Sequence, residues 1–558
     1  MRVWNGELAP RSGAAEFDVV VVGAGAIGLT AALAAAVGGA RVAVLEKARY
    51  LGGTAAVSGG MLWVPCNRVM TDMGLPDSRE DALRYLRAVT AGRTAEDVLA
   101  AIVDRGTEML EFLQRRAGLR MVPMENFPDY HPEWDGAHPG GRSLDPELYD
   151  IRQLGELVES LRPDLRLPFT MREYEEWRIF TRFPTAMLQE RAEQGLVARG
   201  RALVAPLVKA CADAGVTLVT ECGVERLAVG DDGVVGVVAA TSRSDDGARA
   251  SSRVGARAVV LTCGGFEWSA EMVDDFLSGP VQGSCSPPHN TGDGIRMAAK
   301  VGVKLGSMRE AWWGPMVLVP GDETDGAQTA TLLRFERTGP HTVIVNRNGR
   351  RFVNEAHNYN DMTRAFHLFD PGAYDFANLP AYLIFDQRHL EKYGFLAHRA
   401  GQPTPSWLTS APTIAELAAK LEIDAVGLEA TLERFNAGAR EGVDPDFDRG
   451  ASDYDRYWGD QHAAHPALGP VETAPFYATE VVSGVIGTKG GIVTDGDGRA
   501  LDPFGEPVRG LYAAGNTTAH PMGPGYPGAG ATLGPGSTMA YAAGRAAVGA
   551  VGLGAVSV

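Results

Sequence analysis

The chain has 558 residues, with 69 acidic and 52 basic side chains and a net charge of −17 at pH 7. Its hydrophobic content of 45% is that of an ordinary globular protein, and its length predicts two or more domains. The negative charge disfavours nucleic acids and anionic membranes as partners. The five cysteines lack C-x-x-C spacing, which argues against a metal cluster or a disulfide framework.

The first predicted unit runs from residue 18 to residue 46. An apolar, β-branched run at residues 19–22 predicts a buried parallel strand. It is followed by an alanine-rich helix and a second strand that ends at Glu46. Glycines in G-x-G-x-x-G spacing separate the first strand from the helix: Gly23, Gly25 and Gly28. Glu46 follows about 20 residues later, as in a dinucleotide-binding fingerprint.

This fingerprint predicts how a dinucleotide is held. The glycines let the main chain approach a pyrophosphate at the helix N-terminus, and Glu46 accepts the ribose hydroxyls. Residues 19–40 carry no charge and are also long enough to span a bilayer. The three glycines and the β-branched start favour the strand–helix–strand unit instead.

Further elements follow in chain order. Residues 52–60 predict a glycine-rich loop along the cofactor. The next segments predict helices at 75–120, a surface loop at 123–150, a helix at 192–214, a strand and hairpin at 216–239, and a strand at 258–263. Residues 1–18 lack the apolar segment of a secretion signal, and the scattered cysteines fit a reducing compartment, so we expect a cytoplasmic protein.

The pattern changes between about 284 and 470. Long polar loops, Trp312 and Trp313, and amphipathic helices near 413–421 and 428–438 predict an inserted second domain. Strands and glycines resume near 472. We therefore expect an α/β fold with a Rossmann-like parallel sheet that is discontinuous in sequence (1–283 and 471–558) and an inserted α+β catalytic domain (284–470).

The segment 511–543 is rich in glycine and contains no Lys, Arg, Asp or Glu. Glycines at this density let main-chain N–H groups point at a ligand from close range. A charge-free loop of this kind suits a large, mostly apolar partner.

Six motifs in order resemble the flavoprotein superfamily of fumarate reductases, succinate dehydrogenases and 3-ketosteroid dehydrogenases. They are the glycine fingerprint with Glu46, GGTAAVSGG (52–60), TCGGF (262–266), TGDG (291–294), RRFVNE (350–355) and AAGN (513–516). The resemblance implies a FAD-binding domain split around a catalytic domain, with the isoalloxazine at their interface. Some relatives attach the flavin through a histidine, but residues 1–123 contain none, so noncovalent FAD is expected.

The cofactor contacts that the fingerprint and the resemblance together imply are spread over the whole chain. They are Gly23, Gly25, Ala26, Gly28, Glu46, Lys47, Gly52, Gly53, Thr54, Ser58, Gly59, Gly60, Val224, Gly264, Gly265, Asp293, Gly515, Asn516, Gly530, Thr532 and Leu533.

Within the superfamily, the chain resembles the 3-ketosteroid Δ1-dehydrogenases more than the fumarate reductases. Fumarate reductases resemble one another in an arginine soon after RFVNE and another in the C-terminal glycine segment. Here the first arginine after that motif is Arg364, and none occurs at 511–544. The dehydrogenase likeness lies in F-x-D-Y (127–130), a tyrosine after RFVNE, and Y-P-G-x-G (526–530). The segment after residue 130 is longer and differently charged than in the steroid enzymes.

This likeness implies specific roles in the desaturation of a cyclic ketone. The Tyr526 hydroxyl and the Gly530 N–H would hold the ketone oxygen, and Tyr359 would remove the α-proton with help from Tyr130. An ordinary tyrosine has a pKa of about 10, so Tyr359 needs a lowered pKa or a hydrogen-bonded partner to serve as a base.

Three alternatives remain open at this point. One is the same chemistry on a small non-steroid ketone, another is a fumarate-reductase-like reaction, and the third is a flavin-binding module without activity. We expect a hydrophobic cyclic ketone and an unidentified electron acceptor as partners, no metal, and no membrane span. Asp293 is expected to cap a helix, and Lys489 to be a solvated turn lysine.

Overall fold

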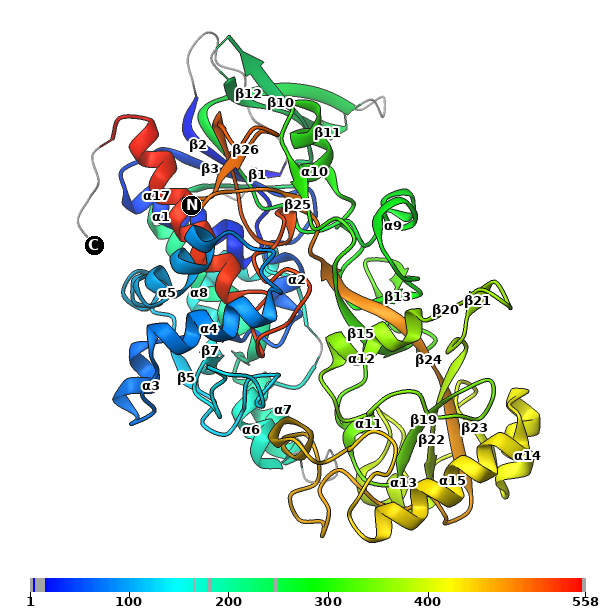
Figure 1. The fold of residues 1–558 in the computed structure, drawn as a ribbon. Helices are drawn as coiled ribbons and strands as arrows, with labels where there is room; N and C mark the ends of the chain where they lie inside the picture. Colours follow the sequence, from blue (N-terminus) through cyan, green and yellow to red (C-terminus); the bar gives the residue numbers. More distant parts are fainter. Residues whose placement is uncertain are drawn as a thin grey trace.

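The structure is a computed structural model that describes residues 4–5, 16–164, 166–177, 183–231, 233–243 and 249–553. Figure 1 shows two lobes: one contains β2, β3 and β12 together with the helices α1, α5, α8 and α17, and the other contains β15, β19, β22 and β24 together with α13, α14 and α15. Among the described residues, none of the helices combines the length and the apolar character that a membrane crossing requires.

A nine-stranded sheet forms the centre of the first lobe, in the order β1-β9-β3-β2-β12-β11-β10 with β27 beside β12. Its parallel part consists of β1 (Trp4–Asn5), β9 (Thr217–Thr220), β3 (Val42–Leu45), β2 (Phe17–Val22), β12 (Arg249–Leu261) and β27 (Pro507–Ala513). The antiparallel extension consists of β10 (Val224–Gly230), β11 (Gly233–Arg243) and β26 (Arg499–Leu501). The four β-branched residues predicted as a buried strand have at most 6% exposure, as helices on both faces of a parallel sheet require.

The carboxyl ends of the parallel strands meet at one edge. Val22 pairs with Leu45 and with Leu261, and Leu261 pairs with Ala513. The loops that follow these strands therefore converge, although they lie almost 500 residues apart in the chain. This edge is where open α/β sheets bind their ligands.

Helices that are rich in small residues cover this sheet. Helix α1 (Ala26–Val37) packs against α17 (Gly534–Ala550) and α8 (Arg199–Asp213), and α17 also packs against α5 (Glu96–Ala117). A Cβ on Gly544 would lie 2.5 Å from the carbonyl oxygen of Ala31, so glycine lets α17 lie close to α1. The C-terminal helix thereby joins the first one, and the domain closes on itself.

The second lobe contains a seven-stranded sheet in the order β18-β15-β24-β22-β19, with β13 and β23 beside β24. Its strands are β18 (Thr331–Leu332), β15 (Ala311–Val317), β24 (Phe476–Thr488), β22 (Ala381–Asp386), β19 (Thr342–Asn346), β13 (Gly283–Ser284) and β23 (Thr409–Ala411). Residues of α14 (Ile414–Leu421) and α15 (Ala425–Arg440) complete a core on this sheet.

The remaining elements are short. The helices are α2 (Gly53–Ala56), α3 (Arg68–Asp72), α4 (Arg79–Val89), α6 (Met171–Trp177), α7 (Thr185–Glu193), α9 (Ala270–Phe276), α10 (Asp293–Lys300), α11 (Phe335–Thr338), α12 (Tyr359–Arg364), α13 (Gln387–Tyr393), α16 (Asp453–Tyr457) and the 3₁₀ segments Ile151–Ser160, Ala365–His367 and Gly515–Thr517. The strands are β4 (Leu62–Trp63), β5 (Met121–Pro123), β6 (Ser143–Pro146), β7 (Tyr149–Asp150), β8 (Leu196–Val197), β14 (Leu305–Gly306), β16 (Glu323–Thr324), β17 (Ala327–Gln328), β20 (Phe369–Asp370), β21 (Asp375–Phe376) and β25 (Gly491–Ile492).

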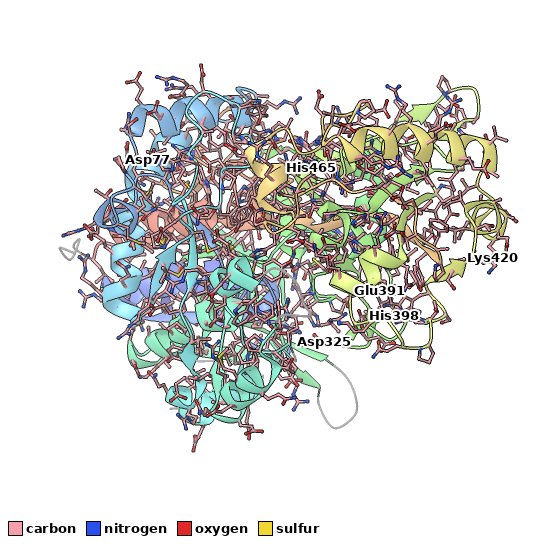
Figure 2. The ribbon with its side chains drawn as sticks, turned by 90° about the horizontal axis from the view of Figure 1, so that it is seen from below. Asp77, Asp325, Glu391, His398, Lys420 and His465 are labelled. Atoms are coloured by element: carbon pink, nitrogen blue, oxygen red, sulfur yellow. The ribbon has the colours of Figure 1, made fainter. Side chains whose placement is uncertain are left out.

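Charged contacts join the lobes. Figure 2 shows Asp77 in the first lobe, Glu391, His398 and Lys420 in the second, and Asp325 low in the view between them. Asp325 lies 2.8 Å from Arg162, which follows the 3₁₀ segment of the first lobe, and 2.7 Å from His289.

The structure corrects two expectations. The segment 123–150, expected as a surface loop, contains the buried residues Asp129, Tyr130 and Arg142, and Tyr130 packs against Tyr359 and Tyr454 of the second lobe. Strand β24 was assigned to the second part of the FAD-binding domain, but it pairs with β15 and β22 in the other sheet. The domain division itself stays a prediction. Its last boundary, predicted at residue 470, would have to follow β24 for this strand to belong to the inserted part.

Candidate active site

The first glycine loop lies at the carboxyl edge of the parallel sheet, between β2 and α1. A Cβ on Gly28 would lie 2.0 Å from the carbonyl oxygen of Gly23, so the helix can approach the strand only with glycine there. A Cβ on Gly25 would meet no described atom within 4 Å, so open space lies over this glycine at the N-terminus of α1, which starts at Ala26. This is the geometry of a pyrophosphate cradle.

Glu46 lies beside this loop, 8% exposed. Its two carboxylate oxygens accept hydrogen bonds from the N–H groups of Ala24 (2.9 Å) and Ala48 (2.8 Å). The carboxylate therefore fixes the turn after β2 in addition to any contact with a ribose.

The second glycine loop lies against the first one. Gly52 donates to the carbonyl of Ala24 at 2.9 Å, and a Cβ on Gly53 would lie 3.7 Å from the Cα of Gly25. The neighbouring Gly59 also has open space at its Cβ position, whereas Gly60 is packed against the main chain of Arg199. The two loops thus form one continuous glycine-lined surface.

Four polar residues predicted to contact the cofactor bind other protein groups. The Lys47 ammonium lies 2.7 Å from Asp293 and donates to Thr291, and Ser58 donates to Ala55 O at 2.7 Å. Asp293 is the first residue of α10, whose N-cap is Gly292, so the expected capping role was wrong. Thr54 accepts from the Asn290 amide at 3.2 Å.

The remaining predicted contacts sit at the ends of β10, β12 and β27. Val224 is the buried first residue of β10. Gly264 and Gly265 pack against Asn290 and Thr488, and Gly515 has a positive φ of 71° against Ile27. The Asn516 side chain accepts from the Trp312 indole at 3.0 Å, and Leu533 precedes α17. A glycine-lined surface beside the N-terminus of α1, with open space at Gly25 and Gly59, fits a dinucleotide such as FAD.

The structure brings together all three tyrosines that the sequence singled out. Their ring centroids lie 4.9 Å apart for Tyr130–Tyr526, 5.4 Å for Tyr359–Tyr526 and 5.7 Å for Tyr130–Tyr359. The Tyr130 hydroxyl donates to the Tyr359 hydroxyl at 3.2 Å. The Tyr526 hydroxyl lies 3.2 Å from the Thr532 hydroxyl.

Gly530 completes this cluster. Its φ is 93°, and a Cβ there would lie 2.7 Å from the main chain of Met61 and Trp63. The turn thus lies directly on β4, four residues from Tyr526, where only glycine fits.

Burial dominates the electrostatics of the tyrosines. It raises the pKa of Tyr359 well above 10, although the hydrogen bond from Tyr130 acts in the opposite direction. Burial also raises the pKa of Tyr526, opposed by the hydrogen bonds to Thr532 and Tyr359. The hydrogen bond that could assist a phenolate at Tyr359 is present, but it does not outweigh desolvation.

Tyr130 is clamped to the C-terminal glycine loop. Its N–H donates to the carbonyl of Pro527 at 2.9 Å, and the Tyr85 hydroxyl donates to the same carbonyl at 2.7 Å. The preceding Asp129 accepts from the Trp63 indole at 2.8 Å and pairs with Arg142 at 2.7 Å. These buried contacts hold the F-x-D-Y segment beside Tyr526.

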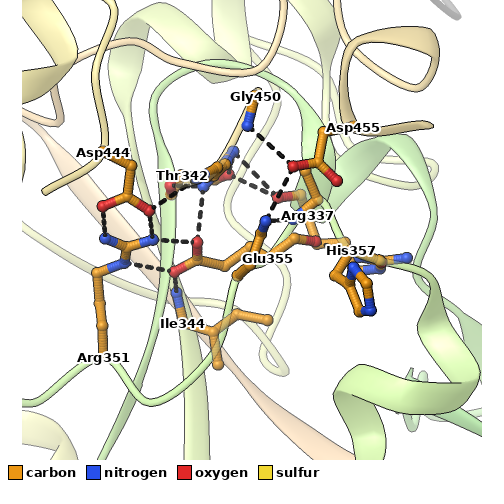
Figure 3. Close-up of polar contacts among 12 residues, drawn as sticks. Arg337, Thr342, Ile344, Arg351, Glu355, His357, Asp444, Gly450 and Asp455 are labelled. Carbon is orange, nitrogen blue, oxygen red and sulfur yellow. Dashed lines mark hydrogen bonds and ion pairs between the residues drawn. The ribbon is translucent and has the colours of Figure 1, made fainter. Parts of the chain in front are cut away.

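Figure 3 shows a buried ionic network around Glu355, which lies four residues before Tyr359 in the chain. Glu355, fully buried, pairs with Arg351 (2.6 Å) and Arg449 (3.1 Å), and Arg351 also pairs with Asp444 (2.7 Å). Burial alone would raise the pKa of Glu355, but the two guanidinium groups hold it below its usual range. Helix α12 begins at Tyr359, shortly after this motif. The buried ion pairs of the RRFVNE motif therefore hold the start of the helix in place.

Two functional neighbours escaped the sequence analysis. Lys489 is not a solvated turn lysine: it is fully buried, lies 4.0 Å from the centroid of the Trp312 ring and donates to Gly525 O at 2.7 Å. His131 pairs with Asp361 at 3.0 Å, next to Tyr130 and two residues after Tyr359. His357 joins these two in a group whose ligand atoms lie within 4.8 Å of one another. Only the position of His131 right after F-x-D-Y could have indicated its role.

Arg364, the first arginine after RFVNE, pairs with Glu310 at 2.9 Å and donates to Pro524 O at 2.6 Å. Both contacts engage its Nη2 atom. The arginine that a dicarboxylate site would use is thus bound to the protein.

Comparisons with known proteins agree with this geometry. The family described as "FAD binding domain" matches residues 18–533. The chain is 50% identical to the 4-oxocyclohexanecarboxylate 2-dehydrogenase of Sinomonas cyclohexanicum, over 97% of this chain and 94% of that protein. It is 39% identical to a 3-oxosteroid 1-dehydrogenase of Mycobacterium tuberculosis, over 95% and 97% of the two chains. Among solved structures, the 3-ketosteroid Δ1-dehydrogenase of Sterolibacterium denitrificans matches with a TM-score of 0.88 and 35% identity, over 96% and 99% of the two chains.

Proposed function

The chain belongs to the FAD binding domain family of flavoproteins, and from this premise we propose that it desaturates a cyclic ketone between the α- and β-carbons. FAD is its cofactor, and it is an oxidoreductase of the dehydrogenase type. The observation that carries the proposal is the cluster of Tyr130, Tyr359 and Tyr526 against the Gly530 turn, at the edge where the cofactor loops converge.

The residues of the cluster have two roles: two groups bind the ketone oxygen, and another removes the α-proton. The Tyr526 hydroxyl and the Gly530 N–H donate to the ketone oxygen, where negative charge develops as the α-proton leaves. Each donor of this kind contributes about 2.7–4 kcal/mol. Bound FAD supplies the oxidant for the hydride that leaves the β-carbon.

Tyr359 accepts the α-proton. Its raised pKa makes the phenolate scarce at neutral pH, so proton removal depends on the hydrogen bond from Tyr130, which stabilises the phenolate. The buried ring of Trp312 lies 4.6 Å from that of Tyr526.

A small cyclic ketone is the substrate that we favour. Tyr130 contacts Tyr454 as well as Tyr359 and Tyr526, so aromatic rings crowd the site from several sides. The Sinomonas relative, at 50% identity, is named for a cyclohexanone acid, and the relatives named for steroids are less similar. A 3-ketosteroid is the second candidate, supported by the likeness to the Sterolibacterium structure.

Four further points belong to this proposal. The cofactor is bound noncovalently, in a FAD-binding domain that is split around the inserted lobe. The enzyme is cytoplasmic, which agrees with its five free cysteines. The predicted cofactor residues at the glycine loops bind FAD. A separate electron acceptor reoxidises the enzyme.

The test is a panel of ketones with an artificial dye as electron acceptor, applied to the wild type, Tyr359→Phe and Tyr526→Phe. We expect an enone absorbance to grow with cyclohexanones, and we expect each variant to lose about 10²–10⁴-fold in rate while it keeps FAD. Full activity of Tyr359→Phe would remove this residue from the mechanism. Turnover of fumarate or succinate, with no turnover of ketones, would favour the fumarate-reductase alternative.

A further inference from the structure

Most cations around the tyrosine cluster are engaged by protein groups. Arg337 is buried and donates to the carbonyls of Glu355 and His357, as Figure 3 shows, and Arg364 and Lys489 bind main-chain carbonyls before Tyr526. His131 pairs with Asp361. In the part of the chain that the structure describes, each of these four is thus already bound to a carboxylate or to a main-chain carbonyl.

Arg334 differs from all of them. It lies half-buried between β18 and α11, and its main-chain N–H donates to the Glu336 carboxylate at 3.0 Å. Among the described residues, no hydrogen bond or ion pair involves its guanidinium group. Glu336, the acidic residue nearest in sequence, thus binds the main chain of Arg334 and does not pair with its guanidinium group.

The fold places the chain just before Arg334 against β15, the strand that packs on the tyrosine cluster. Leu332 pairs with Met316 of β15, and the next residue, Leu333, donates its N–H to Pro315 O at 3.0 Å, which fixes the path of the chain up to Arg334. The same strand β15 carries Trp312, whose ring contacts that of Tyr526. Leu332 packs against the core that contains all three tyrosines.

The charge of Arg334 reaches this site. It acts to lower the pKa of Tyr526, against the larger effect of burial, and it acts in the same direction on Cys285. It also acts to lower the pKa of Arg199, whose guanidinium stacks on Phe169 at 4.3 Å. The positive charge of Arg334 therefore acts on Tyr526, the hydroxyl donor of the proposed ketone site.

A half-buried guanidinium without a counterion is costly unless an anion joins it. Its planar fork matches a carboxylate in a bidentate arrangement. We propose that Arg334 binds a carboxylate on the substrate, so that the substrate class is a six-membered cyclic ketone carrying a carboxylate across the ring from the ketone. This inference rests on the proposed function, in which Tyr526 and Gly530 hold the ketone oxygen.

The consequence is a division of recognition between two ends of one ring. The Tyr526 hydroxyl and the Gly530 N–H bind the neutral ketone oxygen, and the Arg334 guanidinium binds the negatively charged carboxylate. A neutral steroid would leave the guanidinium without an anion. Arg334 is thus a specificity-determining residue that takes no part in proton removal.

The experiment compares 4-oxocyclohexanecarboxylate with its methyl ester on the FAD-loaded enzyme. For Arg334→Leu we expect kcat/KM for the acid to fall about 10–150-fold, the range for a hydrogen bond to a charged group, with the ester changed less than about twofold. Arg334→Lys keeps the charge and should restore part of the loss. The matched control is Arg166→Leu, because Arg166 is also close to this region but is paired with Asp164 at 2.7 Å. It should leave the ratio of acid to ester unchanged.

A binding measurement separates this inference from the proposed function. Cyclohexanecarboxylate, which has no ketone, should perturb the flavin absorbance of the wild type and bind at least tenfold more weakly to Arg334→Leu. Equal losses for the acid and the ester, equal binding of the probe by both proteins, or no binding by the wild type would overturn the carboxylate role. If the wild type binds the probe through Arg334 but converts neither ketone, the proposed reaction is wrong and the anion site stands.

Discussion

The cofactor edge and the tyrosine cluster are adjacent, but they are built by opposite means. At the edge, main-chain atoms of glycine loops form the surface, and each loop follows directly from the strand before it. In the cluster, side chains from positions 130, 359 and 526 meet, and buried contacts behind them hold each in place. Substitutions that add a side chain to a glycine should therefore disturb the cofactor edge. Substitutions that remove a buried contact behind the tyrosines should disturb the cluster.

The largest expected effect is at the anchor of Tyr359. Glu355→Gln leaves two buried guanidinium groups with less than their full counter-charge, and removal of one partner from a buried ionic group costs about 3–5 kcal/mol. We expect the free energy of unfolding to fall by this amount and the activity to fall with it, because α12 starts from this motif. Denaturant unfolding checks the first point. Asp446→Asn, which breaks an ion pair with a 60% exposed Arg434 side chain, is the control and should cost about 1 kcal/mol or less.

A pair of glycine variants probes the cofactor edge. Gly28→Ala places a methyl group 2.0 Å from a main-chain oxygen, so we expect a loss of about 3 kcal/mol or more in stability. Gly25→Ala meets no described atom within 4 Å and has an ordinary φ of −70°, so it should fold normally and bind FAD more weakly. Thermal unfolding and the FAD content after purification separate the two. Equal FAD content in Gly25→Ala and the wild type would mean that the cofactor lies elsewhere.

A smaller, pH-dependent effect is expected at the clasp between His131 and Asp361. Burial lowers the pKa of His131, but the carboxylates of Asp361 and Glu133 outweigh it and raise this pKa to about 9. Since the folded-state pKa lies above the ordinary value of 6.5, the stabilisation is fully present below pH 6.5 and is lost as the pH rises through 9. His131→Gln should therefore lose about 1–2 kcal/mol at pH 6 and little at pH 10.

Activity gives a second measure of this clasp. His131 and Asp361 lie close to Tyr130 and Tyr359 in the chain. The variant His131→Gln should therefore have a lower kcat but nearly the same affinity for FAD as the wild type. Phe369→Ala, on an exposed strand of the second lobe, is the control and should show no such dependence on pH. An unfolding free energy for His131→Gln that parallels the wild type from pH 6 to pH 10 would contradict the ion pair.

The sequence by itself determined the features that depend on a few neighbouring residues. The β-branched run at 19–22, the glycine spacing and Glu46 predicted strand, turn and helix, because strand sterics and close main-chain approach are local properties. The FAD-binding fold and the three tyrosines followed from the resemblance of short motifs to a known flavoprotein superfamily. The buried state of segment 123–150 and the pairing of β24 did not, since both depend on what the other lobe presents.

Only the tertiary structure decided which charges are free. Lys489 and Arg334 are both cations, yet main-chain carbonyls bind Lys489, whereas no described residue bonds to the guanidinium of Arg334. Tyr130 and Tyr359 are 229 residues apart, and their contact arises from the packing of the two lobes. Hydrogen bonding and desolvation depend on every group within a few ångströms, and the folded chain draws those groups from distant segments.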